Sequence, residues 1–116
     1  MSAAALASRR CQAVLPAATS EDIARMLPML PAWAVQDGKL VRAFAFKDHY
    51  ETLAFVNALA WVSHTEDHHP ELTVTYNRCV VRYDTHSVNA GKGGLSDNDF
   101  ICAAKVDAIY DQRAKA

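Results

Sequence analysis

The chain has 116 residues, of which 51% are hydrophobic, 12 are Lys or Arg and 13 are Asp or Glu. This length fits one domain, and the apolar fraction is sufficient for a hydrophobic core, which excludes a largely disordered chain. The formal net charge of -1 gives no electrostatic basis for direct binding of nucleic acid or of an anionic membrane surface. No apolar run reaches the length of about 18 residues that a membrane-spanning helix requires.

The N-terminal stretch has the composition of a leader. It is rich in alanine and has a short apolar run that Arg9 and Arg10 end. In a secretory signal the basic residues precede the apolar run, so this order does not fit one. We expect residues 1–19 to be a flexible leader and residues 20–116 to form a single domain.

The three cysteines, Cys11, Cys79 and Cys102, are widely spaced and form no Cys-x-x-Cys pair. This pattern indicates neither a disulfide framework nor a structural zinc site. We interpret them as reduced thiols of a cytoplasmic protein, with Cys79 and Cys102 partly in the core.

The first half of the domain predicts a short helix followed by a β-hairpin. Ser20 is expected to cap the helix, which has two acids in its first turn and two prolines that limit its length. Asp37-Gly38 is typical of a hairpin turn, and apolar residues on both sides predict one strand before it and another over 40–46.

The longest helix is predicted over residues 47–69, where no Gly or Pro interrupts the chain and large side chains recur at helical spacing. The predicted stripe consists of Tyr50, Leu53, Ala54, Asn57, Ala60, Trp61 and His64. Pro70 ends the helix and favours an extended backbone at His69. We expect Trp61, like Trp33, to lie in the core rather than to stack on a ligand.

The remaining residues predict a second hairpin and a last helix. Alternation over 72–76 and a β-rich run over 79–85 flank a turn. The glycine-rich loop that follows lacks the Gly-Lys-Ser/Thr sequence of a phosphate-binding loop. Ser96 and Asp99 then match a capping box that begins the last helix. The order α-β-β-α-β-β-α favours an α+β fold, a four-stranded antiparallel sheet with three helices on one face.

The stretch His64-Thr65-Glu66-Asp67-His68-His69-Pro70 concentrates side chains that can do chemistry. His64 and His68 are four residues apart and could share a metal ion, but the metalloprotease motif needs Glu where Thr65 stands. A histidine at a helix C-terminus is also favourable through the helix dipole alone, which explains one ring more easily than two adjacent ones. The third interpretation is acid–base catalysis, because imidazole donates and accepts protons near neutral pH.

The pattern His64-x3-His68-His69-Pro70-x5-Tyr76-x9-His86-x12-Asp99 resembles the signature of the pterin-4a-carbinolamine dehydratases. Trp33 and the segments YNRCVVRYDTHS and GLSDNDFICAAK are similar to the family's corresponding segments, so the resemblance covers about residues 20–112. It implies the same α+β fold and assembly into dimers or tetramers with sheets joined across subunits. The implied reaction removes water from 4a-hydroxytetrahydrobiopterin to give quinonoid dihydropterin, which recycles the pterin of aromatic amino acid hydroxylases. This chemistry requires no cofactor, and we expect no metal.

The resemblance also implies the residues of the active site. His68, His69 and His86 match the family's three active-site histidines, and Asp99 matches its acid. We expect His68 and His86 to be the acid–base pair around the 4a-hydroxyl group and N5, and His69 to hold the substrate. Asp99 would fix a histidine tautomer, cap the last helix, or both. Further candidates for substrate binding are Glu66, Asp67 and Pro70.

A non-catalytic role on the same fold, as an assembly factor or a transcriptional coactivator, is the alternative. The three histidines favour catalysis, because a scaffold has no physical need for imidazoles that converge on one cleft. Two features depart from the family pattern. The loop over 89–94 is a few residues longer than in animal members, and His64 stands where an acid is commoner.

Overall fold

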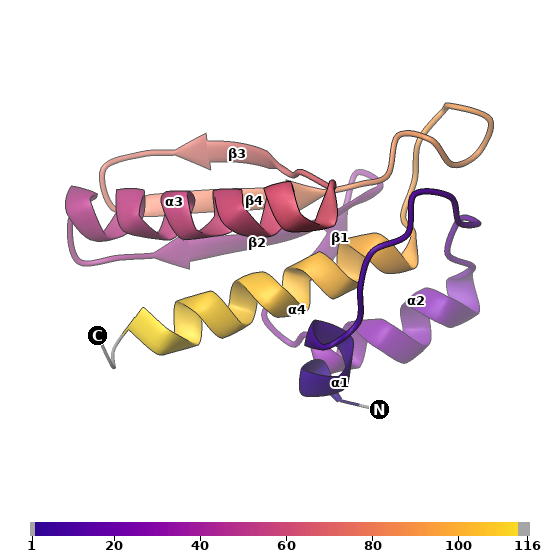
Figure 1. The fold of residues 1–116 in the computed structure, drawn as a ribbon, viewed down its shortest axis with the longest axis horizontal. Helices are drawn as coiled ribbons and strands as arrows, with labels where there is room; N and C mark the ends of the chain where they lie inside the picture. Colours follow the sequence, from indigo (N-terminus) through magenta and orange to yellow (C-terminus); the bar gives the residue numbers. More distant parts are fainter. Residues whose placement is uncertain (1, 114–116) are drawn as a thin grey trace.

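The computed structural model describes residues 2–113 and shows helices packed on a four-stranded antiparallel sheet (Figure 1). Its elements in chain order are α1 (Ala3–Ala7), α2 (Ser20–Met26), the 3₁₀ helix η1 (Leu27–Met29), β1 (Ala34–Gln36), β2 (Lys39–Ala45), α3 (His49–Glu66), β3 (Glu71–Val74), β4 (Arg78–Tyr83) and α4 (Asp97–Gln112). The predicted α+β class is confirmed, and α1 is a helix that the sequence did not predict. The last three residues of the predicted domain, 114–116, lie outside the described part. None of the described helices is both long enough and apolar enough to cross a membrane.

The sheet has the strand order β1-β2-β4-β3, so the two predicted hairpins meet through β2 and β4. Both residues of Asp37-Gly38 have positive φ, 51° and 75°, as a tight hairpin turn requires. Leu40 pairs with Tyr83, and Phe44 pairs with Cys79. Because alternate residues of a strand share a face, these four buried side chains point to the same side of the sheet. Helices α3 and α4 lie on that side and complete the core.

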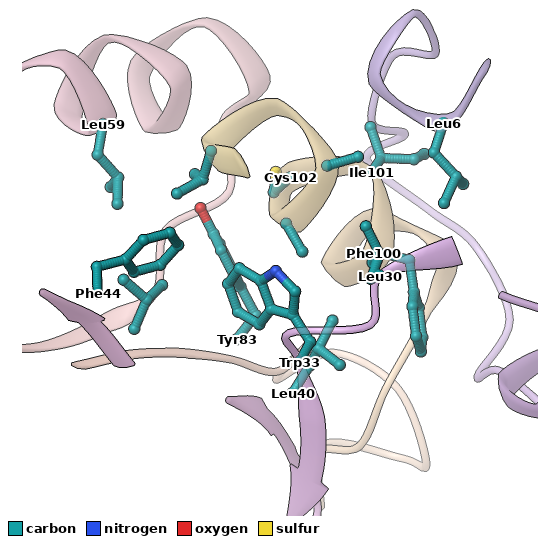
Figure 2. Packing of buried hydrophobic residues seen from close by; sticks show 14 of the residues in the cluster. Leu6, Leu30, Trp33, Leu40, Phe44, Leu59, Tyr83, Phe100, Ile101 and Cys102 are labelled. Carbon is teal, nitrogen blue, oxygen red and sulfur yellow. The ribbon is translucent and has the colours of Figure 1, made fainter. Parts of the chain in front are cut away.

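Aromatic rings fill the space between the sheet and the two long helices. Figure 2 shows Trp33, Phe44 and Tyr83 close together there. The ring centroid of Phe44 lies 5.9 Å from Trp33 and 4.7 Å from Phe55 of α3. The indole N–H of Trp33 donates to Asp107 of α4 at 2.8 Å. The prediction that Trp33 belongs to the core is therefore confirmed, and its polar atom has a partner, as a buried indole requires.

The buried face of α3 differs from the predicted stripe. Thr52, Phe55 and Leu59 face the core, whereas Tyr50 is 81% exposed and Trp61 is 71% exposed. Apolar residues occur on both sides of this helix, so helical periodicity alone did not distinguish the side that packs on the sheet. The prediction of a core position for Trp61 is wrong.

Helix α3 is shorter than predicted, because both of its ends are set by specific backbone contacts. Asp48 caps its start by accepting from the N–H of Glu51 at 2.9 Å. At the other end, Asp67 adopts the left-handed conformation with φ 51°, and the N–H of His68 bonds to the Ser63 carbonyl at 3.2 Å. The chain therefore leaves the helix before His68.

Two helices begin with capping boxes. Ser96 and Asp99 form the one at the start of α4, as the sequence predicted. Thr19 and Asp22 form the one at the start of α2, so Thr19 rather than Ser20 is the cap.

The prediction of a flexible leader over residues 1–19 differs from the structure, in which the described part of this segment packs on α4. Leu6 of α1 is fully buried in the core cluster. The ammonium group of Lys105 on α4 donates to the Ala7 carbonyl at 2.7 Å. The burial of Leu6 and hydrogen bonds to the backbone of the segment hold it against α4. An alanine-rich composition predicts neither of these contacts.

Candidate active site

A cleft with a volume of about 250 Å³ opens where the end of α3, the end of β4 and the start of α4 meet. Its lining residues are Gln12, Ala13, Leu15, Asp67, His68, His69, Asp84, Thr85, His86, Ser87 and Asn98. The volume is close to the lower end of the range for small-molecule sites, about 300–1,000 Å³. Histidines from two distant parts of the chain thus border one hollow.

His68 is held at the inner wall of this cleft by a buried carboxylate. Its Nε2 lies 2.6 Å from Oδ1 of Asp99, and its ring stacks on Tyr83 with centroids 5.7 Å apart and 8° between the planes. The side chain of His68 is 12% exposed, and that of Asp99 is 0% exposed. Since an ionised carboxylate only accepts, this contact suits the His68 tautomer that carries its proton on Nε2.

Asp99 has donors for both of its oxygens. Besides the contact with His68, its Oδ2 accepts from the Thr85 hydroxyl at 2.9 Å and from the Ser96 N–H at 3.0 Å. These contacts satisfy an ionised carboxylate that is shielded from water. Asp99 therefore caps α4 and places Oδ1 within hydrogen-bonding distance of Nε2 of His68.

His69 and His86 are neighbours in the same cleft. Their ring centroids lie 6.3 Å apart, with 74° between the planes. His86 is 76% exposed, and its Nε2 lies 3.4 Å from Oδ1 of Asp84, which also pairs with Lys39 at 3.6 Å. Asp84 was not among the predicted site residues, although an acid two residues before a candidate histidine was a usable signal. The open position of His86 lets its ring contact a ligand in the cleft.

Residues 16–109 match the model of a family described as pterin 4 alpha carbinolamine dehydratase. The chain belongs to this family. A relative from Bdellovibrio bacteriovorus, named "Putative pterin-4-alpha-carbinolamine dehydratase", is 53% identical over 109 residues, which are 94% of this chain and 91% of the relative. A relative of the same name from Xanthomonas oryzae pv. oryzae is 58% identical over 92 residues, which are 78% of this chain and 75% of the relative. The resemblance inferred from the sequence is thereby confirmed.

Two solved structures of pterin dehydratase-like proteins share the fold. One, described as a transcriptional coactivator/pterin dehydratase from Brucella melitensis, has a TM-score of 0.73 at 32% identity and covers 81% of this chain and 98% of its own. The other, described as a pterin dehydratase-like protein and RuBisCO assembly factor in the alpha-carboxysome, has a TM-score of 0.58 at 27% identity and covers 68% and 89%. These two proteins share the fold but are described with different functions. The fold alone therefore does not identify the function of a family member, which depends on its site.

Two of the predicted substrate contacts of this pterin dehydratase family member are not in the cleft. The carboxylate of Glu66 accepts from the Cys11 N–H at 2.7 Å and pairs with Arg10 at 2.8 Å. Burial raises the pKa of Glu66, but the Cys11 hydrogen bond and the charges of Lys105 and Arg10 outweigh burial and lower it overall. This position fits an anchor of the N-terminal segment rather than a substrate contact. Pro70 is likewise not part of the lining, whereas Asp67 is.

The metal interpretation, in which His64 and His68 share an ion, does not fit the geometry. His64 lies on the exposed side of α3, where its ring is 5.8 Å from that of Trp61. His68 follows the helix end and turns toward Asp99 instead, so the two rings do not share a helix face. Within residues 2–113, no group of three or more His, Cys, Asp or Glu side chains is arranged to hold a metal ion.

The N-terminal segment supplies one wall of the cleft, although the dehydratase family match begins only at residue 16. The N–H of Gln12 donates to the Asn98 side-chain oxygen at 3.0 Å, and the Asn98 side-chain nitrogen donates to the Gln12 carbonyl at 2.8 Å. Neither residue was among the predicted site residues, because the two lie 86 positions apart and neither belongs to a catalytic residue type.

Proposed function

We propose that this protein removes water from 4a-hydroxytetrahydrobiopterin, a pterin-4a-carbinolamine, to give quinonoid dihydropterin, and so serves the recycling of tetrahydrobiopterin in the cytoplasm. The observation that carries the proposal is that three imidazoles border one cleft, and one of them is oriented by a buried carboxylate. Membership of the pterin-4a-carbinolamine dehydratase family supports the same reaction.

The reaction requires only the transfer of protons. The bond between C4a and the hydroxyl oxygen breaks, and its electron pair leaves with the oxygen, which takes a proton from a general acid. N5 loses its proton to a general base, and its electrons form the double bond to C4a. No atom is oxidised or reduced overall, so one protonated and one neutral imidazole are sufficient.

We assign the acid and the base to His68 and His86. Asp99 restricts His68 to one orientation and one tautomer, which leaves Nδ1 for the reacting atoms. His86 is accessible, and the Asp84 carboxylate near its Nε2 orients it. His69, which lies beside His86, holds and polarises the substrate. Asp67 borders the substrate in the same cleft.

The direct test is a stopped-flow assay with freshly generated 4a-hydroxytetrahydrobiopterin. We expect the disappearance of the carbinolamine to accelerate in proportion to protein concentration, beyond its spontaneous dehydration. A rate that stays at the spontaneous value with micromolar protein would refute the dehydratase proposal and leave the non-catalytic alternative.

We also propose that the exposed side of α3 contributes an interface between copies of the chain, in addition to the joined sheets that the family resemblance implies. Its seam residues follow one another at intervals of three and four: Tyr50, Leu53, Asn57, Trp61 and His64. This spacing is that of helices that pack against a partner helix, and the seam carries no Asp, Glu, Lys or Arg. A homodimer or homotetramer would bury Tyr50 and Trp61, which are exposed in the single chain.

Replacing Trp61 with aspartate is expected to shift the protein toward smaller assemblies, because an aspartate in the seam would be desolvated on association. Light scattering at micromolar concentration should give at least a dimer for the wild type and a smaller mass for Trp61→Asp. Val14→Asp, at another exposed apolar side chain, is the matched control and should keep the wild-type mass. A wild type that is already monomeric would contradict self-association.

A further inference from the structure

Two cysteines that are far apart in the sequence lie together in the structure. The Sγ atoms of Cys11 and Cys102 are 3.5 Å apart. Cys11 belongs to the N-terminal segment and is partly exposed, whereas Cys102 lies on α4 and is fully buried. We propose that this pair is an oxidation site, at which Cys11 and Cys102 form a reversible disulfide that ties the N-terminal segment to α4. The inference goes beyond the dehydratase activity and does not depend on it.

The backbone holds Cys11 at this position without help from its sulfur. The N–H of Cys11 donates to the buried carboxylate of Glu66 at 2.7 Å, and the next residue, Gln12, exchanges two hydrogen bonds with Asn98 of α4. A disulfide brings the sulfurs to about 2.05 Å, so they must approach by about 1.5 Å. Rotation of the Cys11 side chain, which lies in a loop rather than in a helix, can supply most of this movement.

The chemistry needs a co-reactant, and a small-molecule disulfide such as oxidised glutathione balances it. The Cys11 thiolate attacks one sulfur of glutathione disulfide, and the first glutathione leaves as a thiolate. The Cys102 thiol then loses its proton and attacks the Cys11 sulfur, which releases the second glutathione. The two protein thiols are oxidised by two electrons in total, and glutathione disulfide is reduced to two glutathione molecules.

The two sulfurs differ in a way that sets this order. The hydrogen bond with Cys11 and burial both raise the pKa of the Cys102 thiol, which is therefore a poor first nucleophile. Cys11 is also the one that a small disulfide can reach. Cys79, the third cysteine, is buried in the sheet, where burial raises its pKa to about 11. We infer that Cys11 is the first nucleophile, which attacks the small disulfide, and that Cys102 resolves the mixed disulfide.

The proposed bond lies next to one wall of the cleft. Cys102 is one helical turn beyond Asn98 on the same face of α4, and Cys11 directly precedes Gln12. Gln12 and Asn98 both line the cleft. In the reduced protein this wall is held by hydrogen bonds and can open by local unfolding, whereas the disulfide would hold it covalently. Disulfides of this kind in the cytoplasm are usually transient and redox-sensing.

The test is to equilibrate the full-length wild-type protein with oxidised glutathione and to measure its intact mass and peptide map. We expect the loss of two hydrogens, a peptide in which Cys11 is linked to Cys102, and a rise in melting temperature on the order of 10 °C that dithiothreitol reverses. Cleavage by trypsin after Arg9 and Arg10 should slow in the oxidised form. The Cys79→Ala variant should behave like the wild type.

Cys11→Ser supplies the decisive comparison, because it changes a partly exposed residue and leaves the core intact. It should show neither the linked peptide nor the rise in melting temperature. The proposal is overturned by stable glutathione adducts at Cys11 without a linked peptide, by a linked peptide that contains Cys79, or by an equal rise in melting temperature in Cys11→Ser.

Discussion

Replacing His68 and His69 together with alanine is expected to lower kcat/KM for dehydration of the carbinolamine by roughly 10⁴-fold. The double variant removes the ring that Asp99 orients and the ring that lies 6.3 Å from His86. Without them, the leaving oxygen and N5 lose proton-transfer partners that the cleft positions. Stopped-flow measurement with freshly generated 4a-hydroxytetrahydrobiopterin determines the rate, and circular dichroism determines whether the fold is kept.

The matched control for this experiment is His64→Ala. His64 belongs to the same histidine-rich stretch but lies on the exposed side of α3, away from the cleft. It should retain the wild-type rate. Because the double variant leaves the buried Asp99 without one donor, His86→Ala serves as a second test that changes a largely exposed ring. Wild-type turnover in a folded double variant would contradict histidine acid–base catalysis.

Replacing Asp99 with asparagine is expected to lower kcat/KM by about 10²–10⁴-fold while the enzyme remains folded. The asparagine oxygen can still accept from Ser96 and Thr85, so its amide nitrogen must face Nε2 of His68. An amide N–H donates, and Nε2 must then accept, which moves the ring proton to Nδ1. The variant thus presents the wrong tautomer to the substrate. We expect it to lose about 1–3 kcal/mol of stability, because a charged hydrogen bond is lost.

The tautomer can be read directly, which separates this positioning role from a merely structural one. Nitrogen chemical shifts of His68 should place the proton on Nε2 in the wild type and on Nδ1 in Asp99→Asn. Asp97→Asn is the matched control, since Asp97 lies on the same helix turn and pairs with Arg9 at the surface. Unchanged kcat/KM in Asp99→Asn, or an unchanged tautomer, would remove Asp99 from the proposed mechanism.

Local features of this chain were readable from the sequence where one short segment contains the whole physical cause. Asp37-Gly38 contains both residues that the hairpin turn places at positive φ. Ser96 and Asp99, three residues apart, form the predicted capping box. The signature histidines were readable for a different reason, because the spacing of residue types over 64–99 resembles one family whatever contacts they make. In the turn and the capping box, the interacting groups are neighbours along the chain.

Other features required contacts that no local pattern encodes. Apolar residues occur on both sides of α3, and only packing on the sheet decides that Phe55 is buried while Trp61 is exposed. Glu66 stands among the candidate site residues in the sequence, yet a distant backbone N–H from Cys11 draws it away from the cleft. An alanine-rich composition likewise gives no sign of the single leucine that anchors the N-terminal segment.

The sequence by itself determined the α+β class, the strand pairing within each hairpin and the membership of the family, because these depend on residue types at short spacing. Only the tertiary structure decided that His68 rests on Asp99, that Gln12 borders the cleft, and that Cys11 meets Cys102. Those contacts join segments that are 31 to 91 residues apart. Their formation depends on how the helices pack on the sheet, which hydrophobic burial settles over the whole chain rather than within one segment.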